Sequence, residues 1–137
     1  GLKKSVLDDF SRELDSDYDA TIKRFLALQA RGSLDSRNTL KKLRKNCLNQ
    51  SPPDQNALKG GLGILKTADM RSQLLTLTIP ITMILGERDS IVDCRIGNVL
   101  DDCMNNLQLC VIPQAGHAPF LSHPEQFQRT AQDFISN

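Results

Sequence analysis

Two short apolar runs in the second half of the chain constrain its fold more than any other feature. Residues 81–85 (ITMIL) and residues 107–112 (LQLCVI) are each followed by a glycine or a proline. Runs of this length with such boundaries are typical of strands buried in a parallel sheet. We predict a helix over about 93–104 between them and a final amphipathic helix that begins at Pro124. The order strand, helix, strand, helix predicts a right-handed βαβ unit and an α/β fold.

A parallel sheet normally has more than two strands and is covered on both faces. We therefore expect residues 76–137 to be the C-terminal part of a larger α/β core. The chain begins with Gly1 and not with Met, which agrees with an upstream segment that is missing here.

Residues 1–75 are predicted to form helices, because apolar side chains recur at helical spacing. The expected apolar faces are, in chain order, Val6, Leu7, Phe10 and Leu14, then Ile22, Phe25 and Leu26, then Leu40, Leu43 and Cys47, then Leu58, Leu62 and Leu65. The expected boundaries are Gly32, Asp35 or Ser36, the pair Pro52 and Pro53, and Asp54 as an N-cap. In the last helix, Phe127, Ala131, Phe134 and Ile135 are expected to form the apolar face.

Composition excludes several classes of protein. The hydrophobic fraction of 39% and the charged fraction of 24% are ordinary for a globular domain. No apolar run approaches the ~20 residues that span a bilayer. The four cysteines have no metal-ligand spacing and lie mostly among apolar neighbours, so we expect reduced thiols in a cytoplasmic protein rather than a disulfide. We expect no metal and no cofactor.

One acid and one base follow the two predicted strands. Asp89 lies in the loop after residues 81–85, and His117 lies in the loop after residues 107–112. Taken separately, such an Asp is usually a turn or cap residue and such a His is usually structural. Because the carboxyl ends of parallel strands meet at one edge of a sheet, the two side chains are expected to form a hydrogen-bonded pair. The other histidine, His123, precedes a helix and is expected to be a cap or surface residue.

The sequence around this pair resembles the end of the α/β-hydrolase fold, with GERDSIV at 86–92 and GHAPFLSHPEQF at 116–127. Over nearly its whole length the chain resembles the carboxylesterases of biotin synthesis that act on pimeloyl-carrier-protein methyl ester, through RFLALQ at 24–29, GGLGILKT at 60–67 and HAPFLSHP at 117–124. The resemblance implies that Asp89 is the triad acid, His117 the base, and residues 1–75 a helical cap over residues 76–137.

The nucleophile of that fold lies in a G-x-S-x-G turn, and no serine of this chain has that context. The resemblance therefore implies that the serine and the oxyanion-hole donors belong to a missing N-terminal half. The chain alone should be inactive.

Basic residues are concentrated in one stretch of the predicted cap. Residues 23–45 hold eight Lys or Arg and only one acid, whereas the whole chain has a net charge of +1. Their simplest role is a solvated face that keeps the protein soluble. The resemblance implies instead that Arg24, Arg37 and Lys41 dock an acidic acyl carrier protein bearing a pimeloyl methyl ester, with Phe25 at the mouth of the acyl channel. Nucleic acid is a poor alternative as a partner, because no stacking aromatic residues accompany the charges and the chain is not strongly basic overall.

Two functional alternatives stay open. The chain could be a non-catalytic module that binds a carrier protein through its cap. The same Asp and His ending also occurs in lipases, haloalkane dehalogenases and C–C hydrolases of the α/β-hydrolase fold, and the missing nucleophile would distinguish them. Ala20 stands where the resemblance leads us to expect a basic residue, so docking could be weaker or shifted.

Overall fold

The computed structural model of this chain describes residues 3–48 and 53–136. Its elements, in chain order, are α1 (Lys4–Ser16), α2 (Tyr18–Ala30), α3 (Ser36–Cys47), α4 (Gln55–Thr67), α5 (Arg71–Leu75), β1 (Ile81–Gly86), α6 (Arg95–Asp101), β2 (Leu107–Ile112), α7 (Pro119–Ser122) and α8 (Pro124–Ser136). Pro52, one of the expected boundary residues, lies outside the described residues.

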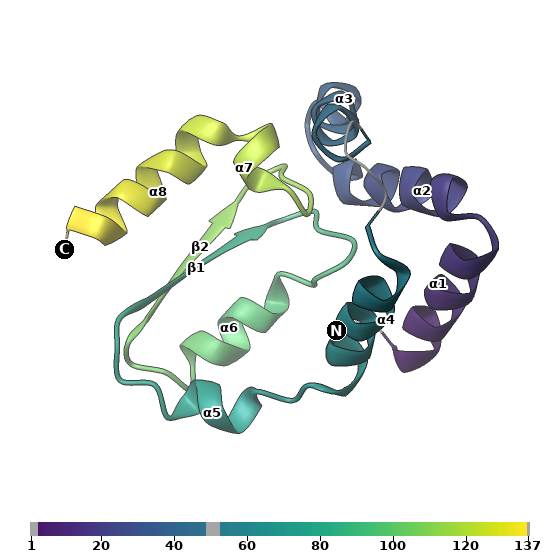
Figure 1. The fold of residues 1–137 in the computed structure, drawn as a ribbon. Coiled ribbons are helices and arrows are strands. Elements are labelled where there is room, and N and C mark those ends of the chain that lie inside the picture. The colour runs from purple at the N-terminus through teal and green to yellow at the C-terminus, as the bar shows by residue number, and fades with distance from the viewer. Residues whose placement is uncertain (1–2, 49–52, 137) are drawn as a thin grey trace.

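The two predicted strands pair as expected. β1 and β2 form a parallel ladder from Ile81 opposite Leu107 to Gly86 opposite Ile112. Figure 1 shows α6 on one face of this sheet and α8 on the other. The β-α-β-α order is that of an α/β core, which confirms the predicted fold class. Within the described residues each strand has one neighbour, and residues 81–85 are only half-buried.

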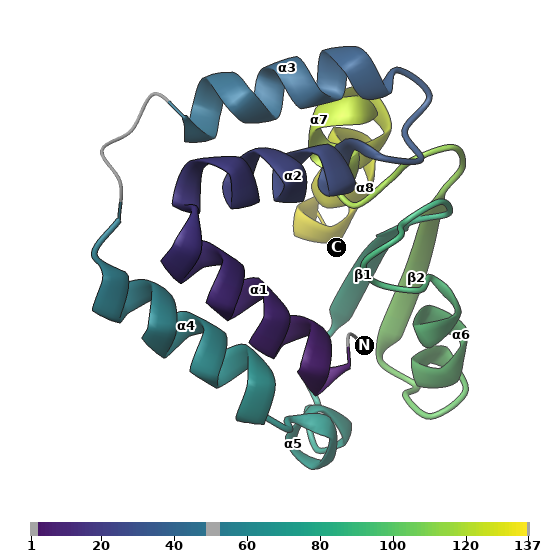
Figure 2. The same cartoon turned by 90° about the vertical axis from the view of Figure 1, so that its right-hand side faces the viewer.

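The first four helices lie side by side in the order α3, α2, α1, α4 (Figure 2). The core of this helical group lies between α2 and α3, where Leu26, Ala30 and Leu43 are buried. Leu121 of α7 packs against the same cluster. The Lys42 side chain on α3 also donates a hydrogen bond of 3.0 Å to the Leu121 carbonyl oxygen. The helical group is thereby attached to the segment that follows β2.

Three of the four helices of this group, α2, α3 and α4, begin at an aspartate. The side chains of Asp17, Asp35 and Asp54 each accept a hydrogen bond of 3.0 Å from the backbone N–H three residues further on. Such N-caps satisfy a backbone donor that has no partner inside the helix. Asp35 and Asp54 were predicted as boundaries and are confirmed. Asp17 was not predicted, and it separates α1 from α2 with no glycine or proline between them.

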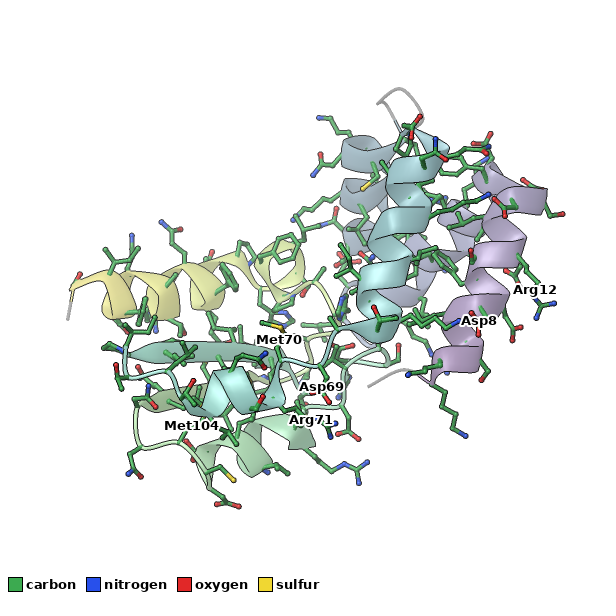
Figure 3. All side chains as sticks on the ribbon, turned by 60° about the horizontal axis from the view of Figure 1, so that its bottom comes forward. Asp8, Arg12, Asp69, Met70, Arg71 and Met104 are labelled. Atoms are coloured by element: carbon green, nitrogen blue, oxygen red, sulfur yellow. The ribbon has the colours of Figure 1, made fainter. Side chains whose placement is uncertain are left out.

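One ion pair joins the outer helix α4 to α1, and another lies in the segment after α4. Figure 3 labels Asp8 on α1, which pairs with Lys66 of α4. It also labels Asp69, between α4 and α5, which pairs with Arg71 at the start of α5. The hydrogen bond from the Arg71 side chain lowers the pKa of Asp69 to about 2. Because these groups are exposed, such pairs contribute little to stability individually.

Several residues expected to face the core are exposed. The relative exposure is 69% for Leu65, 42% for Phe134 and 81% for Ile135. The helix pattern was correct, but α4 packs mainly along α1, and the two-stranded sheet is too narrow to cover the whole apolar face of α8. Cys47 and Cys103 are exposed, and Cys94 and Cys110 are partly buried, so none of the four cysteines lies in the core. All four are free thiols.

The helix predicted over about 93–104 is shorter than expected. It covers only Arg95–Asp101, because the Asp93 side chain accepts the backbone N–H of Arg95 and residues 102 and 103 form a turn. The short helices α5 and α7 were not predicted. Within residues 3–48 and 53–136, no helix is both long and apolar enough to cross a membrane.

Candidate functional site

The expected acid and base meet at the carboxyl edge of the sheet. Asp89 lies in the loop after β1 and His117 in the loop after β2. The Nδ1 atom of His117 lies 2.8 Å from the Oδ2 atom of Asp89. The expected hydrogen bond is therefore present, although 28 residues separate the two side chains in the sequence.

The carboxylate of Asp89 is held on both oxygens. Its side chain is only 5% exposed. Oδ1 accepts hydrogen bonds from the backbone N–H groups of Ile91, at 2.8 Å, and Val92, at 3.0 Å. An ionised carboxylate can only accept hydrogen bonds. The proton of the Asp89–His117 hydrogen bond is then carried by Nδ1 of the imidazole.

A proton on Nδ1 leaves the lone pair of the neutral ring on Nε2. The His117 side chain is 33% exposed, and its only hydrogen bond within the described residues is the one to Asp89. Nε2 is therefore able to accept a proton from a group that approaches from outside this chain. An imidazole that is oriented by a buried carboxylate has the properties of a general base.

The two loops are held together by backbone contacts. The backbone N–H of Arg88 donates to the Ala115 carbonyl oxygen at 2.8 Å, and the N–H of Glu87 donates to Ile112 at 3.0 Å. The Glu87 carboxylate accepts a hydrogen bond of 2.9 Å from the N–H of Gln114. Gln114 has a φ of 58°, which is uncommon for a residue with a side chain and here turns the chain toward His117.

Two other titratable residues follow the members of the pair closely in the sequence and have partners of their own. The hydrogen bond from the Arg95 side chain lowers the pKa of exposed Asp93 to about 2. His123 joins α7 to α8, where its carbonyl oxygen accepts the N–H of Phe127 at 3.0 Å, so the expected cap position is confirmed. The Nδ1 atom of His123 lies 2.9 Å from the Ser122 hydroxyl.

The basic residues of the helical group are not equivalent. Arg24 binds Glu13 at 2.7 Å and the Thr21 hydroxyl at 3.0 Å, so its charge is partly compensated. Arg37 and Lys41 on α3 are exposed, and neither side chain has a hydrogen bond or ion pair with another described residue. Arg24 and Arg37 line the same open groove between α2 and α3, of about 450 Å³.

Phe25 lies on a different side of α2 from this groove. It is half-buried, and its ring packs against that of Phe10 on α1 with 5.2 Å between the ring centroids. Leu26 is 3% exposed and belongs to the core, as expected. The structure therefore separates Phe25 from the groove that Arg24 and Arg37 share.

Some residues that shape the site were not found from the sequence. The loop that carries His117 includes Gln114, and it donates hydrogen bonds to the side chains of Glu87 and Ser33. The sequence indicated only that a helix ends at Gly32. It did not indicate which loop the chain after that helix would contact. Within the described part of the chain, no group of three or more His, Cys, Asp or Glu side chains has an arrangement that could hold a metal ion.

No family model matches the chain. It is 39% identical over 135 residues to the pimeloyl-[acyl-carrier protein] methyl ester esterase of Photobacterium profundum. It is 38% identical over 136 residues to the protein of the same name from Serratia marcescens, and 40% identical over 127 residues to that of Pectobacterium atrosepticum. These alignments cover 98%, 99% and 93% of this chain, respectively.

The chain spans about half the length of the curated relatives it matches, with 53%, 53% and 50% covered. The chain is also similar in structure to about half of a solved esterase from Exiguobacterium antarcticum. The superposition has a TM-score of 0.83 with 18% identity, and it covers 100% of this chain and 50% of that one. The structural likeness confirms the fold, and the sequence likeness confirms the resemblance noted above.

Proposed function

We propose, on the premise that this chain is homologous to about half of a pimeloyl-[acyl-carrier protein] methyl ester esterase, that it supplies the acid and the base of a serine carboxylesterase. The parent protein would hydrolyse the methyl ester of a pimeloyl group carried by an acyl carrier protein. The observation that carries this proposal is the pair of Asp89 and His117, with the carboxylate fixed by two backbone N–H groups.

The proposed reaction is a two-step ester hydrolysis. A serine from the rest of the parent attacks the ester carbonyl carbon while Nε2 of His117 takes its proton. Asp89 keeps the ring oriented and stabilises the imidazolium that forms. Methanol leaves with the proton from His117, and an acyl-enzyme remains. A water molecule, activated by the same Nε2, then releases the free acid and restores the serine.

The chain contributes two of the three triad members. Ser90 adjoins Asp89 and is exposed, but it lies in a turn after a strand and has no G-x-S-x-G context. Its neighbour Asp89 is hydrogen-bonded to Nδ1 of His117, whereas a nucleophile must face Nε2. We therefore place the nucleophile in the rest of the parent, and we place the protein in the cytoplasm because its four cysteines are free thiols.

Comparing the longer natural protein with this 137-residue chain tests the proposal. We expect the longer protein to release methanol from a pimeloyl methyl ester on acyl carrier protein and to hydrolyse p-nitrophenyl acetate. This chain alone should do neither, because it lacks a nucleophile. Gas chromatography of methanol and the absorbance of nitrophenol measure the two reactions. Turnover by the purified 137-residue chain would overturn the division of the triad, and carrier binding without turnover by the longer protein would favour the non-catalytic module.

The proposed carrier-docking surface consists of Arg37 and Lys41, with Arg24 at the edge of the shared groove. In the longer protein, Arg37→Glu and Lys41→Glu should each raise KM for the carrier-bound ester by about three- to tenfold, and kcat should change little. Both side chains are exposed, so the effect should shrink as salt is raised toward ~1 M. Kinetics at two ionic strengths measure it.

Arg129→Glu on α8 is the matched control for these charge reversals, since Arg129 is exposed and lies outside the α2–α3 groove. It should leave KM for the carrier-bound ester unchanged. Hydrolysis of p-nitrophenyl acetate should be unaffected in all three variants, because that substrate has no carrier. If Arg129→Glu raises KM as much as Arg37→Glu does, the effect comes from net charge and no docking surface exists on α3.

A further inference from the structure

The turn between α2 and α3, residues 31–35, touches the loop that carries His117. The backbone N–H of Leu34 donates to the Gln114 carbonyl oxygen at 3.0 Å. The Ser33 hydroxyl oxygen accepts the backbone N–H of Gly116 at 3.3 Å. Gly116 directly precedes His117, so this hydrogen bond acts on the peptide group that leads into the proposed base.

The approach of the turn to both loops is too close for side chains. Gly32 has a φ of 87°, and a Cβ atom there would lie 2.3 Å from the carbonyl oxygen of Arg88 in the loop after β1. A Cβ atom at Gly116 would lie 2.3 Å from the carbonyl oxygen of Arg31. Distances below 3.0 Å are essentially never observed for Cβ atoms. The turn is therefore packed backbone to backbone between the loop of Asp89 and the loop of His117.

The hydrogen bond from Gly116 to Ser33 is shielded from water. Ser33 is 7% exposed and Gly116 is buried. A buried N–H that loses its acceptor cannot be compensated by solvent without a rearrangement of the backbone around it. Among the described residues, the Ser33 hydroxyl is the only acceptor within hydrogen-bond distance of this N–H. Removing the hydroxyl should therefore move or loosen the His117 loop and leave the helices intact.

We propose that Ser33 is a positioning residue for His117. Its hydroxyl holds the peptide before His117 in the orientation that keeps Nδ1 on Asp89 and Nε2 accessible. The expected effect of Ser33 on turnover rests on the proposed function. Its expected effect on the Asp89–His117 hydrogen bond does not. The same turn begins α3, so it also fixes the proposed docking residues Arg37 and Lys41 relative to the base.

Four variants of the full-length protein test the role of Ser33. Ser33→Ala removes the acceptor, and Ser33→Cys replaces it with a weak acceptor of similar shape, which keeps the test usable if Ser33→Ala does not fold. Ser33→Thr restores a hydroxyl. Thr39→Val is the matched control, because Thr39 is also buried on α3 and its hydroxyl bonds only to the Asp35 carbonyl oxygen, at 2.9 Å.

The expected result is a fall in kcat of about tenfold in Ser33→Ala and Ser33→Cys, since small displacements of a catalytic group cost that much or more. The fall should be equal for p-nitrophenyl acetate and for the carrier-bound ester, and KM for the acetate should stay unchanged. The downfield NMR resonance of the His117 Nδ1 proton should shift or broaden. Ser33→Thr should recover most of the kcat, and Thr39→Val should match the wild type in both measurements.

Three results would overturn the inference. One is an unchanged kcat and an unchanged Nδ1 resonance in Ser33→Ala. Another is a loss confined to the carrier-bound ester, which would assign the turn to docking only. The third is an equal loss in Thr39→Val, which would indicate a general loss of stability. If the wild-type protein hydrolyses no ester, the proposed function fails, and the Nδ1 resonance alone still decides whether Ser33 positions His117.

Discussion

Replacing His117 by alanine in the full-length protein should lower kcat for ester hydrolysis by about 10³- to 10⁶-fold, with little change in KM. The loss is large because Nε2 would act in both steps, first as a base toward the serine and then as an acid toward methanol. No described side chain besides Asp89 lies within hydrogen-bond distance of the ring, so no neighbour can replace it. Steady-state kinetics with p-nitrophenyl acetate measure the effect without any contribution from carrier docking.

The second histidine is a natural control for this experiment. His123 is six residues away, bonds to Ser122, and lies where α7 meets α8. His123→Ala should keep kcat within a few-fold of the wild type. If His117→Ala retains a tenth or more of the activity, or if His123→Ala loses as much, then His117 is not the base.

The acid can be tested in the same way. Asp89→Asn keeps the shape of the side chain, but its amide can donate to Nδ1 and so favours the wrong tautomer of His117. A fall in kcat of about 10⁴-fold is expected from this change. Asp93→Asn is the control, because Asp93 lies four residues away, is exposed, and pairs only with Arg95. Equal losses in both variants would mean that the loop needs carboxylates for its fold and that Asp89 has no special role.

Replacing Gly86 by alanine should lower the free energy of unfolding by at least about 2 kcal/mol. Gly86 ends β1, and a Cβ atom there would lie 2.1 Å from the carbonyl oxygen of Gly116 and 2.6 Å from that of Ala115. Both atoms belong to the backbone before His117, so no side-chain rotation can relieve the overlap. The strand end and the His117 loop must separate, and esterase activity should fall together with stability. Chemical denaturation of the full-length protein measures the first effect.

A glycine-to-alanine substitution in α4 should instead raise the free energy of unfolding. Gly63 lies inside that helix, and nothing comes within 4 Å of a Cβ atom added to it. Gly63→Ala should stabilise the protein by about 0.5–1 kcal/mol, since alanine loses less backbone entropy than glycine in a helix. Activity should stay unchanged. If Gly86→Ala does not lower the free energy of unfolding relative to Gly63→Ala, then the end of β1 and the His117 loop are not packed as closely as described.

Local patterns were sufficient for most of the secondary structure. The two strands, the starts of α3 and α4, and the start of α8 at Pro124 were predicted from apolar runs, N-caps and proline, which act over a few residues. Burial was predicted less well. Leu26 is in the core, whereas Leu65 and Ile135 are exposed, because burial depends on what packs against a helix and not on the helix itself.

For the candidate site, the sequence by itself determined that an acid and a base follow two adjacent parallel strands, since strand order and direction bring such loops to one edge of the sheet. Their roles in catalysis remain predictions. Only the tertiary structure decided that Asp89 also accepts two backbone hydrogen bonds, that Phe25 turns away from the groove of Arg24 and Arg37, and that the α2–α3 turn lies against the His117 loop. The Ser33–Gly116 contact joins residues 83 positions apart, and no local pattern encodes it because it depends on how the helical group docks on the strand ends.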